Sequence, residues 1–149
     1  MFGGAFDGRA AVAVELILAP YRAEEDPVAL VRYTHELTIR FDGGAQPALM
    51  VVLEIAAAGM SHMTMRALGQ ETFQHPEPPL VALVTADETA HRLTRALPWF
   101  GILNVTAVRT VNEAVRWVEQ ARGEPLLARF TELLEEARRR AERRPTLPD

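Results

Sequence analysis

Three apolar runs decide the fold of this chain: LMVVLEI (residues 49–55), LVALV (80–84) and NVTAV (104–108). A turn-like segment follows each run, namely GMS (59–61), TAD (85–87) and TVN (110–112). Each turn opens a stretch in which apolar residues recur at helical spacing. Strands that alternate with helices are typical of βα units. We therefore expect an α/β domain with a mainly parallel sheet of roughly four to five strands.

The remaining elements follow from the same patterns. Residues 11–18 (AVAVELIL) predict a mostly buried strand that precedes the three runs. Asp26 and Pro27 form a good helix start, and apolar spacing extends this helix to Phe41. Residues 28–41 are also rich in β-forming side chains, so a strand is the alternative there. Further helices are expected over residues 61–73, 87–97 and 112–120.

The chain divides into one main domain and distinct ends. Residues 1–9 are rich in glycine and predict a flexible N-terminus, residues 10–122 form the domain, and residues 145–149 predict a disordered tail. Residues 123–144 predict an extra C-terminal helix whose apolar stripe ends near Leu134. The second half of that helix is polar on all sides, which indicates either a solvated helix end or a partner-binding arm.

Composition narrows the classes of function. A chain of 149 residues, 48% of them hydrophobic, is long enough for one domain with a real core. The chain has no cysteine, and all 16 basic residues are arginine, which excludes disulfides, thiolate chemistry and lysine Schiff bases. The net charge of −4 predicts no nucleic-acid partner. No signal-peptide pattern or run of about 18 apolar residues is evident, so we expect a cytoplasmic location and no stable membrane insertion.

Three segments resemble the STAS domain of anti-sigma-factor antagonists and its STAS/SEC14-type relatives. They are LEIAAAGMS (53–61), VALVT (81–85) and VRTVNEAVRWV (108–118), and the last is similar to the closing signature of that family. The resemblance covers residues 12–118. It implies a STAS-like four-turn βα superhelix with a mixed, mainly parallel sheet. It also implies a non-enzymatic regulatory or scaffold role in bacterial-type signalling, exerted through protein–protein interaction.

The resemblance also points to a switch segment at the start of the second helix. In phosphorylatable members of the family this helix opens with Asp-Ser-Ser/Thr-Gly-Leu, and a kinase modifies a Ser or Thr there. The present chain instead reads GMSHMTM (59–65), so it lacks the clear phosphorylation motif. Ser61 and Thr64 are the modification candidates. For Ser61, which is the only serine in the chain, helix N-capping is the structural alternative.

A docking surface is predicted around this helix. It would bind a protein partner or a second copy of the chain as a homodimer. Trp99 and Phe100 are expected nearby, either as a lid on the core or as an exposed interface anchor. The methionines indicate an adaptable contact surface or core filling, and a Cu(I) site is the least favoured interpretation. The candidate residues are Gly59, Met60, Ser61, His62, Met63, Thr64, Arg66, Trp99 and Phe100.

A binding domain for a small, lipid-like or nucleotide ligand is the alternative function. Its apolar pocket would lie under residues 60–65, and Glu54 and Asp87 are pocket candidates because ligands bind at the carboxyl edge of open α/β sheets. For Asp87, helix capping is the structural alternative, and for Glu54 an outward-facing position on a strand. The histidines lack metal-ligand spacing, so we expect no metal and no cofactor.

Enzymatic function is the least supported class. Ser61, His91 and Asp87 could form a catalytic triad, but no G-x-S-x-G motif accompanies them. The receiver domain of response regulators is a competing resemblance. That domain needs acidic residues after its first strand, where this chain has APY (19–21). We therefore predict a protein that is not an enzyme.

Overall fold

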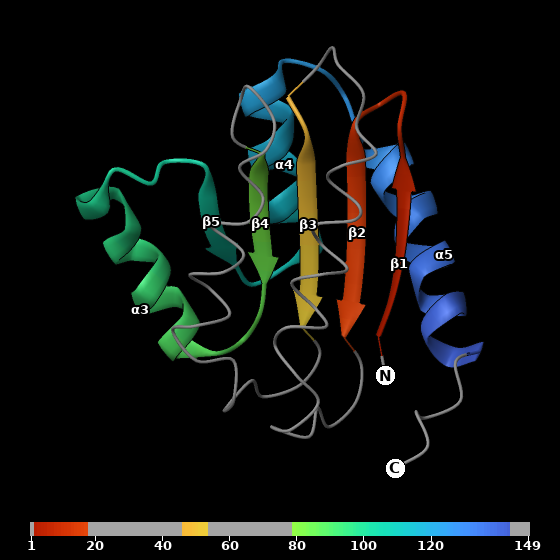
Figure 1. Cartoon of the computed structure of the whole chain (residues 1–149), viewed down its shortest axis with the longest axis horizontal. Helices are drawn as coiled ribbons and strands as arrows, with labels where there is room; N and C mark the ends of the chain where they lie inside the picture. Colours follow the sequence, from red (N-terminus) through yellow and green to blue (C-terminus); the bar gives the residue numbers. More distant parts are fainter. Residues whose placement is uncertain (1, 18–45, 54–78, 144–149) are drawn as a thin grey trace.

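A five-stranded, mostly parallel sheet forms the centre of the molecule (Figure 1). The structure is a computed structural model that describes residues 2–17, 46–53 and 79–143. The strands lie in sequence order across the sheet, with β1 antiparallel to β2 and all later neighbours parallel. Their bounds are β1 Phe2–Asp7, β2 Val12–Ile17, β3 Ala48–Leu53, β4 Leu80–Val84 and β5 Val105–Val108. The α/β class and the four strands predicted from residue 11 onward are confirmed.

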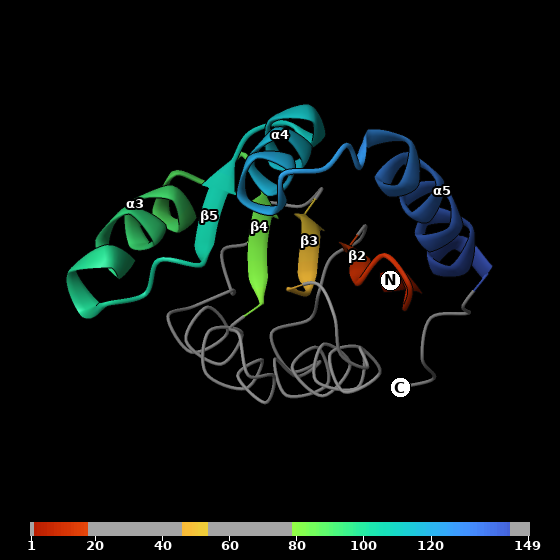
Figure 2. The ribbon, with the colours of Figure 1, turned by 90° about the horizontal axis from the view of Figure 1, so that it is seen from above.

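Helices pack beside and over this sheet. Helix α4 lies over β3, β4 and β5, α5 lies over β1 and β2, and α3 lies beside β5 (Figure 2). A short 3₁₀ helix, η1, continues directly from α3. The bounds are α3 Glu88–Ala96, η1 Leu97–Phe100, α4 Val111–Arg122 and α5 Leu127–Arg143. The helices predicted over 87–97, 112–120 and 123–144 are therefore confirmed as elements.

The core lies between the sheet and helices α4 and α5. Alternate strand residues such as Val14, Met50 and Ala82 face these helices, and Phe130 of α5 fills the space against them. The intervening residues of the central strands, such as Val51, are buried as well. A sheet that is buried on both faces has nearly continuous apolar strands, which is the pattern that made these strands predictable from sequence.

The N-terminus differs from the flexible segment predicted for residues 1–9. Residues 2–7 form β1, which pairs antiparallel with β2 from Phe2↔Ile17 to Asp7↔Val12. The Asp7 carboxylate closes the hairpin, since its Oδ1 accepts hydrogen bonds from the backbone N–H groups of Arg9 and Ala10 at 3.0 and 3.2 Å. The prediction failed because Gly3 and Gly4 hide the strand pattern, while tertiary pairing decides the conformation.

The second half of α5 also differs from prediction. It is neither a solvated helix end nor a free arm, because Ala137 and Ala141 are fully buried, with Ala137 in the core. The Arg140 Nη1 atom donates to the carbonyl oxygen of Gly4 at 2.9 Å. At the other end of the helix, Arg129 pairs with Asp7 at 2.7 Å. Buried alanines at i, i+4 spacing extend the apolar stripe beyond Leu134. The prediction was wrong because it considered only large side chains as members of the stripe.

Several predicted elements lie outside the described residues. These are the helix from Asp26 to Phe41 with its strand alternative, the helix over 61–73 and the tail over 145–149.

Candidate functional site

Polar side chains gather where β4 and β5 end. Thr85 and Asp87 follow β4, Arg109 follows β5, and Glu88 and His91 lie on the first turns of α3. The carboxyl ends of parallel strands meet at one edge of a sheet, and ligands of open α/β sheets bind at such an edge. The contacts of each group therefore decide whether this edge can bind a ligand or support a reaction.

His91 is held by the loop that follows β4. Its imidazole is buried, and its Nε2 atom lies 2.8 Å from the carbonyl oxygen of Thr85. A carbonyl oxygen can only accept a hydrogen bond, so Nε2 carries the proton and donates it. The Thr85 hydroxyl in turn accepts a hydrogen bond from the backbone N–H of Asp87 at 3.1 Å. This imidazole thus fixes the β4–α3 connection, and its Nε2 atom has no lone pair to act as a base or a metal ligand.

Asp87 stands directly before α3, where the sequence predicted a helix cap. Its carbonyl oxygen accepts the hydrogen bond from the His91 N–H at 3.2 Å, which is the first bond of the helix. Asp87 is half-buried and follows β4 at the carboxyl edge of the sheet, and its role as a pocket residue stays a prediction. Ser61, the third member of the possible catalytic triad, lies outside the described residues.

An ion pair joins the first turn of α3 to the residue that follows β5. Arg109 donates from Nη2 to Oε1 of Glu88, and both side chains are about half exposed. The hydrogen bond and the charge of Arg109 hold the pKa of the Glu88 carboxyl below its ordinary value, and His91 and Arg95 add smaller effects in the same direction. A carboxylate in the first turn also interacts favourably with the helix dipole of α3.

Helix α4 begins at the same edge with Thr110 as its N-cap residue. The Thr110 hydroxyl accepts from the backbone N–H of Glu113 at 3.2 Å and donates to the Glu113 carboxylate at 3.1 Å. The first bond is the N-cap bond that Thr favours at a helix start. The second bond runs between the two side chains. The groups at this edge therefore hold the loops and helix ends together.

Among the residues that the structure describes, the most exposed large apolar side chains lie beyond the end of α3, on η1 and on the loop that leads into β5. Trp99 is 86% exposed and Leu103 is 77% exposed. Gly101 makes the turn between them in the left-handed conformation (φ 77°), and its N–H bonds to the carbonyl oxygens of Leu97 and Pro98. The interpretation of Trp99 as a lid on the core is therefore wrong. Phe100 belongs to η1, but its side chain lies outside the described part.

The other predicted site residues lie outside the described residues. They are Glu54, Gly59, Met60, Ser61, His62, Met63, Thr64 and Arg66.

Two buried charged residues were not singled out from the sequence. Glu15 lies in the middle of β2, between Gly4 and Val51 of the neighbouring strands, and is almost fully buried. Arg122 lies at the end of α4 with a side chain that is only 4% exposed. A single charge within an apolar strand such as VAVELI was the available signal for Glu15, because burial of a carboxyl group is costly and so needs a reason.

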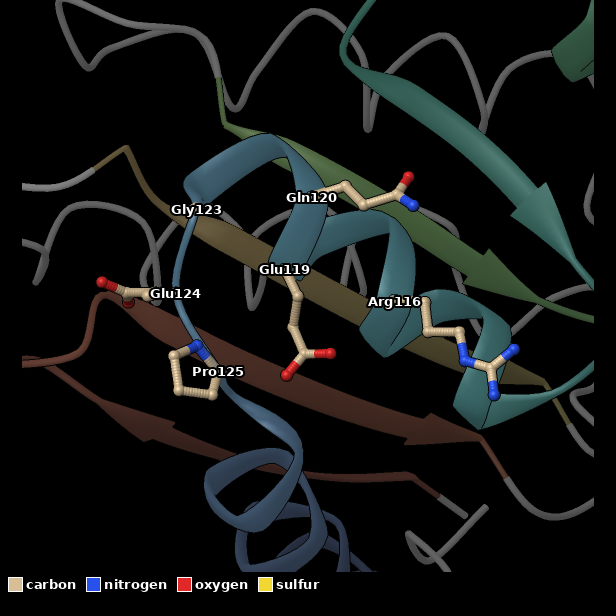
Figure 3. Close-up of a pocket in the computed structure, with 6 residues that line it drawn as sticks. All are labelled: Arg116, Glu119, Gln120, Gly123, Glu124 and Pro125. Carbon is tan, nitrogen blue, oxygen red and sulfur yellow. The ribbon is translucent and has the colours of Figure 1, made fainter.

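The described part of the chain also contains an open hollow of about 450 Å³ on α4 and its connection to α5 (Figure 3). The Arg116 guanidinium, the Gln120 amide and the Glu124 carboxylate point in different directions and do not converge on one point. Glu119 accepts a hydrogen bond from the Leu126 N–H at 2.7 Å, which places its carboxylate in the connection to α5. The hollow therefore presents no convergent set of ligand-binding groups.

Metal-binding clusters and membrane-spanning helices are absent from the same described residues. No group of three or more His, Asp or Glu side chains within residues 2–17, 46–53 and 79–143 could hold a metal ion. No helix in these three ranges is long and apolar enough to cross a membrane.

Comparison with protein-family models, with curated proteins and with solved structures finds no match for this chain.

Proposed function

We propose that this protein is a non-enzymatic regulatory or scaffold module that acts by docking a partner protein. The observation that carries the proposal is the exposure of Trp99, with Leu103 also exposed nearby. Trp is enriched among the side chains that dominate binding energy at protein interfaces, and it anchors them by filling a pocket on the partner. An exposed Trp on a well-formed helical turn is therefore better explained by binding to a partner than by packing within the fold.

The order of the strands supports a STAS-like architecture as the finer part of this proposal. After the antiparallel β1, each strand from β2 to β5 is added beside the previous one in sequence order and in parallel. Successive βα units that advance in one direction would give the superhelix that the resemblance implies. The proposal includes regulatory function in bacterial-type signalling and a cytoplasmic location, both of which rest on the sequence alone.

The contacts at the two ends of α3 also favour docking over reaction. At its start, His91 donates to the Thr85 carbonyl, and Glu88 pairs with Arg109 after β5. Beyond its end, the Asn104 side chain donates to the carbonyl oxygen of Pro79 at 2.6 Å. These contacts fix α3 and the loop around Leu103 against the sheet. A rigid platform lowers the entropic cost of binding a partner, which is a property that a docking module needs.

Affinity capture from the cytoplasm of the source cells, followed by native mass spectrometry, tests the proposal. The wild type is compared with Met60→Glu/Met63→Glu, which alters the surface predicted from the sequence, after circular dichroism has shown that the variant is folded. We expect a protein partner, or a second copy of the chain, that the wild type retains and the folded variant loses. Capture of no protein would contradict the proposal, and a retained small molecule would instead favour the ligand-binding alternative.

A further inference from the structure

The outer face of α3 and η1 combines positive charge with exposed apolar surface. Arg92, Arg95 and Trp99 succeed one another at spacings of three and four residues, which places them on one side of this helical segment. All three are exposed, as is Leu103 after the turn at Gly101. We call Arg92, Arg95, Trp99 and Leu103 the α3–η1 face.

The positive charge of this face is not neutralised by the acidic residues around it that the structure describes. Glu88 lies on the same helix, but its carboxylate is already paired with Arg109. In the described part of the chain neither Arg92 nor Arg95 forms an ion pair. Among the described residues, the face therefore carries two guanidinium groups that form no ion pair, on a protein whose net charge is −4.

We propose that the α3–η1 face docks a short acidic segment of a partner protein. Carboxylates of that segment pair with Arg92 and Arg95, and an apolar side chain between them packs on Trp99 and Leu103. Planar guanidinium groups suit carboxylates because they donate two parallel hydrogen bonds. This inference rests on the proposed docking function and adds the chemistry of the partner.

The size of the face favours a short segment over a second copy of the chain. A Trp side chain contributes about 150–250 Å² to an interface. With Leu103 and the two arginine stems added, the area of the face is still smaller than the roughly 800 Å² that each partner buries in a standard stable interface. A nucleic acid or an anionic membrane is less favoured, because the overall negative charge of the protein repels an extended polyanion.

Selection from a displayed library of random peptides tests the proposal, because it requires no identified partner. The full-length chain is the bait, and the affinities of the enriched peptides are then measured by fluorescence anisotropy. We expect enriched peptides that combine Asp or Glu with a large apolar residue. Their binding should weaken about tenfold or more in Trp99→Ala and in Arg92→Glu/Arg95→Glu.

Two matched controls separate the face from general effects. Leu127→Ala removes another exposed apolar side chain, which is 51% exposed at the start of α5. Arg116→Glu/Arg139→Glu makes the same change in net charge at two exposed arginines on α4 and α5. Both controls should bind the peptides within about twofold of wild type. In a Trp117→Phe background Trp99 is the only tryptophan, so its emission should shift to shorter wavelength when a peptide covers it.

Three outcomes would overturn the proposal. They are enriched peptides without an acidic bias, peptides that bind Trp99→Ala as tightly as wild type, and saturable binding of phosphatidylserine vesicles or single-stranded RNA in place of peptides. The first two outcomes do not contradict the docking function if affinity capture still retains a protein partner. The inference and the function can thus fail separately.

Discussion

At the scale of single residues, charged side chains make contacts that the sequence did not predict. The buried Arg122 joins the end of α4 to the β1–β2 turn, because its Nη1 atom donates to the carbonyl oxygen of Ala11 at 3.0 Å. Its Nη2 atom donates to the carboxylate of the nearby Glu124 at 2.6 Å. Ala11 is the residue with positive φ (53°) in the β1–β2 turn. The Nε atom of Arg122 has no hydrogen-bond partner among the described residues. The two Nη contacts therefore have to offset the free-energy cost of burying the charge.

Arg122→Ala should lower the free energy of unfolding by about 2 kcal/mol, because it removes hydrogen bonds made by a buried charged group and leaves a cavity. Urea denaturation followed by circular dichroism measures this change. Arg116→Ala on the exposed side of the same helix is the matched control and should change stability by less than about 0.5 kcal/mol. Equal effects of the two substitutions would show that the Arg122 contacts contribute little.

The Glu88–Arg109 pair predicts a pH effect of known sign. Arg109 depresses the pKa of Glu88 in the folded protein, so the pair stabilises the fold above the pKa of an unfolded Glu. This contribution is lost as the pH falls through the lower, folded value. Arg109→Ala should raise the pKa of Glu88 toward its ordinary value in a carboxyl ¹³C NMR titration. An unchanged titration curve would mean that solvent screens the pair completely.

At the scale of elements, the central strands were predictable and the two chain ends were not. β3 and β4 are buried on both faces, so their apolar runs are visible in the sequence. In contrast, β1 contains two glycines and is defined by its pairing with β2, and α5 is anchored by alanines. Local patterns carry little information about such contacts, because they depend on residues as distant as Gly4 and Arg140.

The packing of α5 can be tested with one substitution at two positions. Ala137→Glu places a carboxylate in the core between α5 and the sheet, and we expect a loss of more than about 2 kcal/mol in the free energy of unfolding. Ala128→Glu makes the same change on the exposed side of the same helix. It should cost less than about 0.5 kcal/mol. If both variants were equally stable in urea, the second half of α5 would be a solvated arm after all.

The Thr110 N-cap of α4 predicts a smaller effect on stability. Thr110→Ala removes the side-chain acceptor of the Glu113 N–H and should cost about 1 kcal/mol. Thr131→Ala is a suitable comparison, because the Thr131 hydroxyl is exposed and bonds back to the Leu127 carbonyl within α5. It should be close to neutral. Thermal unfolding of the two variants side by side checks the difference, and a Thr110→Ala variant as stable as wild type would contradict it.

At the scale of the whole molecule, α5 and β1 join the two ends of the described chain along one border of the sheet. The Asp7–Arg129 pair and the Arg140–Gly4 hydrogen bond fix this border. Helix α3, which carries Arg92 and Arg95 of the α3–η1 face, lies at the opposite border, beside β5 (Figure 1). One border is therefore closed by contacts within the chain, and the other presents its largest apolar side chain to solvent.

The candidate site could be predicted only in part, because contacts between elements decide much of it. Asp87 follows a strand in the sequence, so its place at the carboxyl edge was predictable. For Trp99 the sequence allowed both a core lid and an exposed anchor, because exposure depends on how α3 packs beside β5. The pairing of Glu88 with Arg109 depends on the alignment of two strand ends and had no signal in the sequence.

Hydrogen–deuterium exchange of the chain, alone and bound to the partner recovered by affinity capture, tests docking through the α3–η1 face most directly. We expect slower exchange in peptides that cover residues 92–103 when the partner is bound. Exchange in α5 should stay the same, because that helix already packs along the closed border of the sheet. Unchanged exchange over residues 92–103, together with protection of α5, would contradict docking at the α3–η1 face.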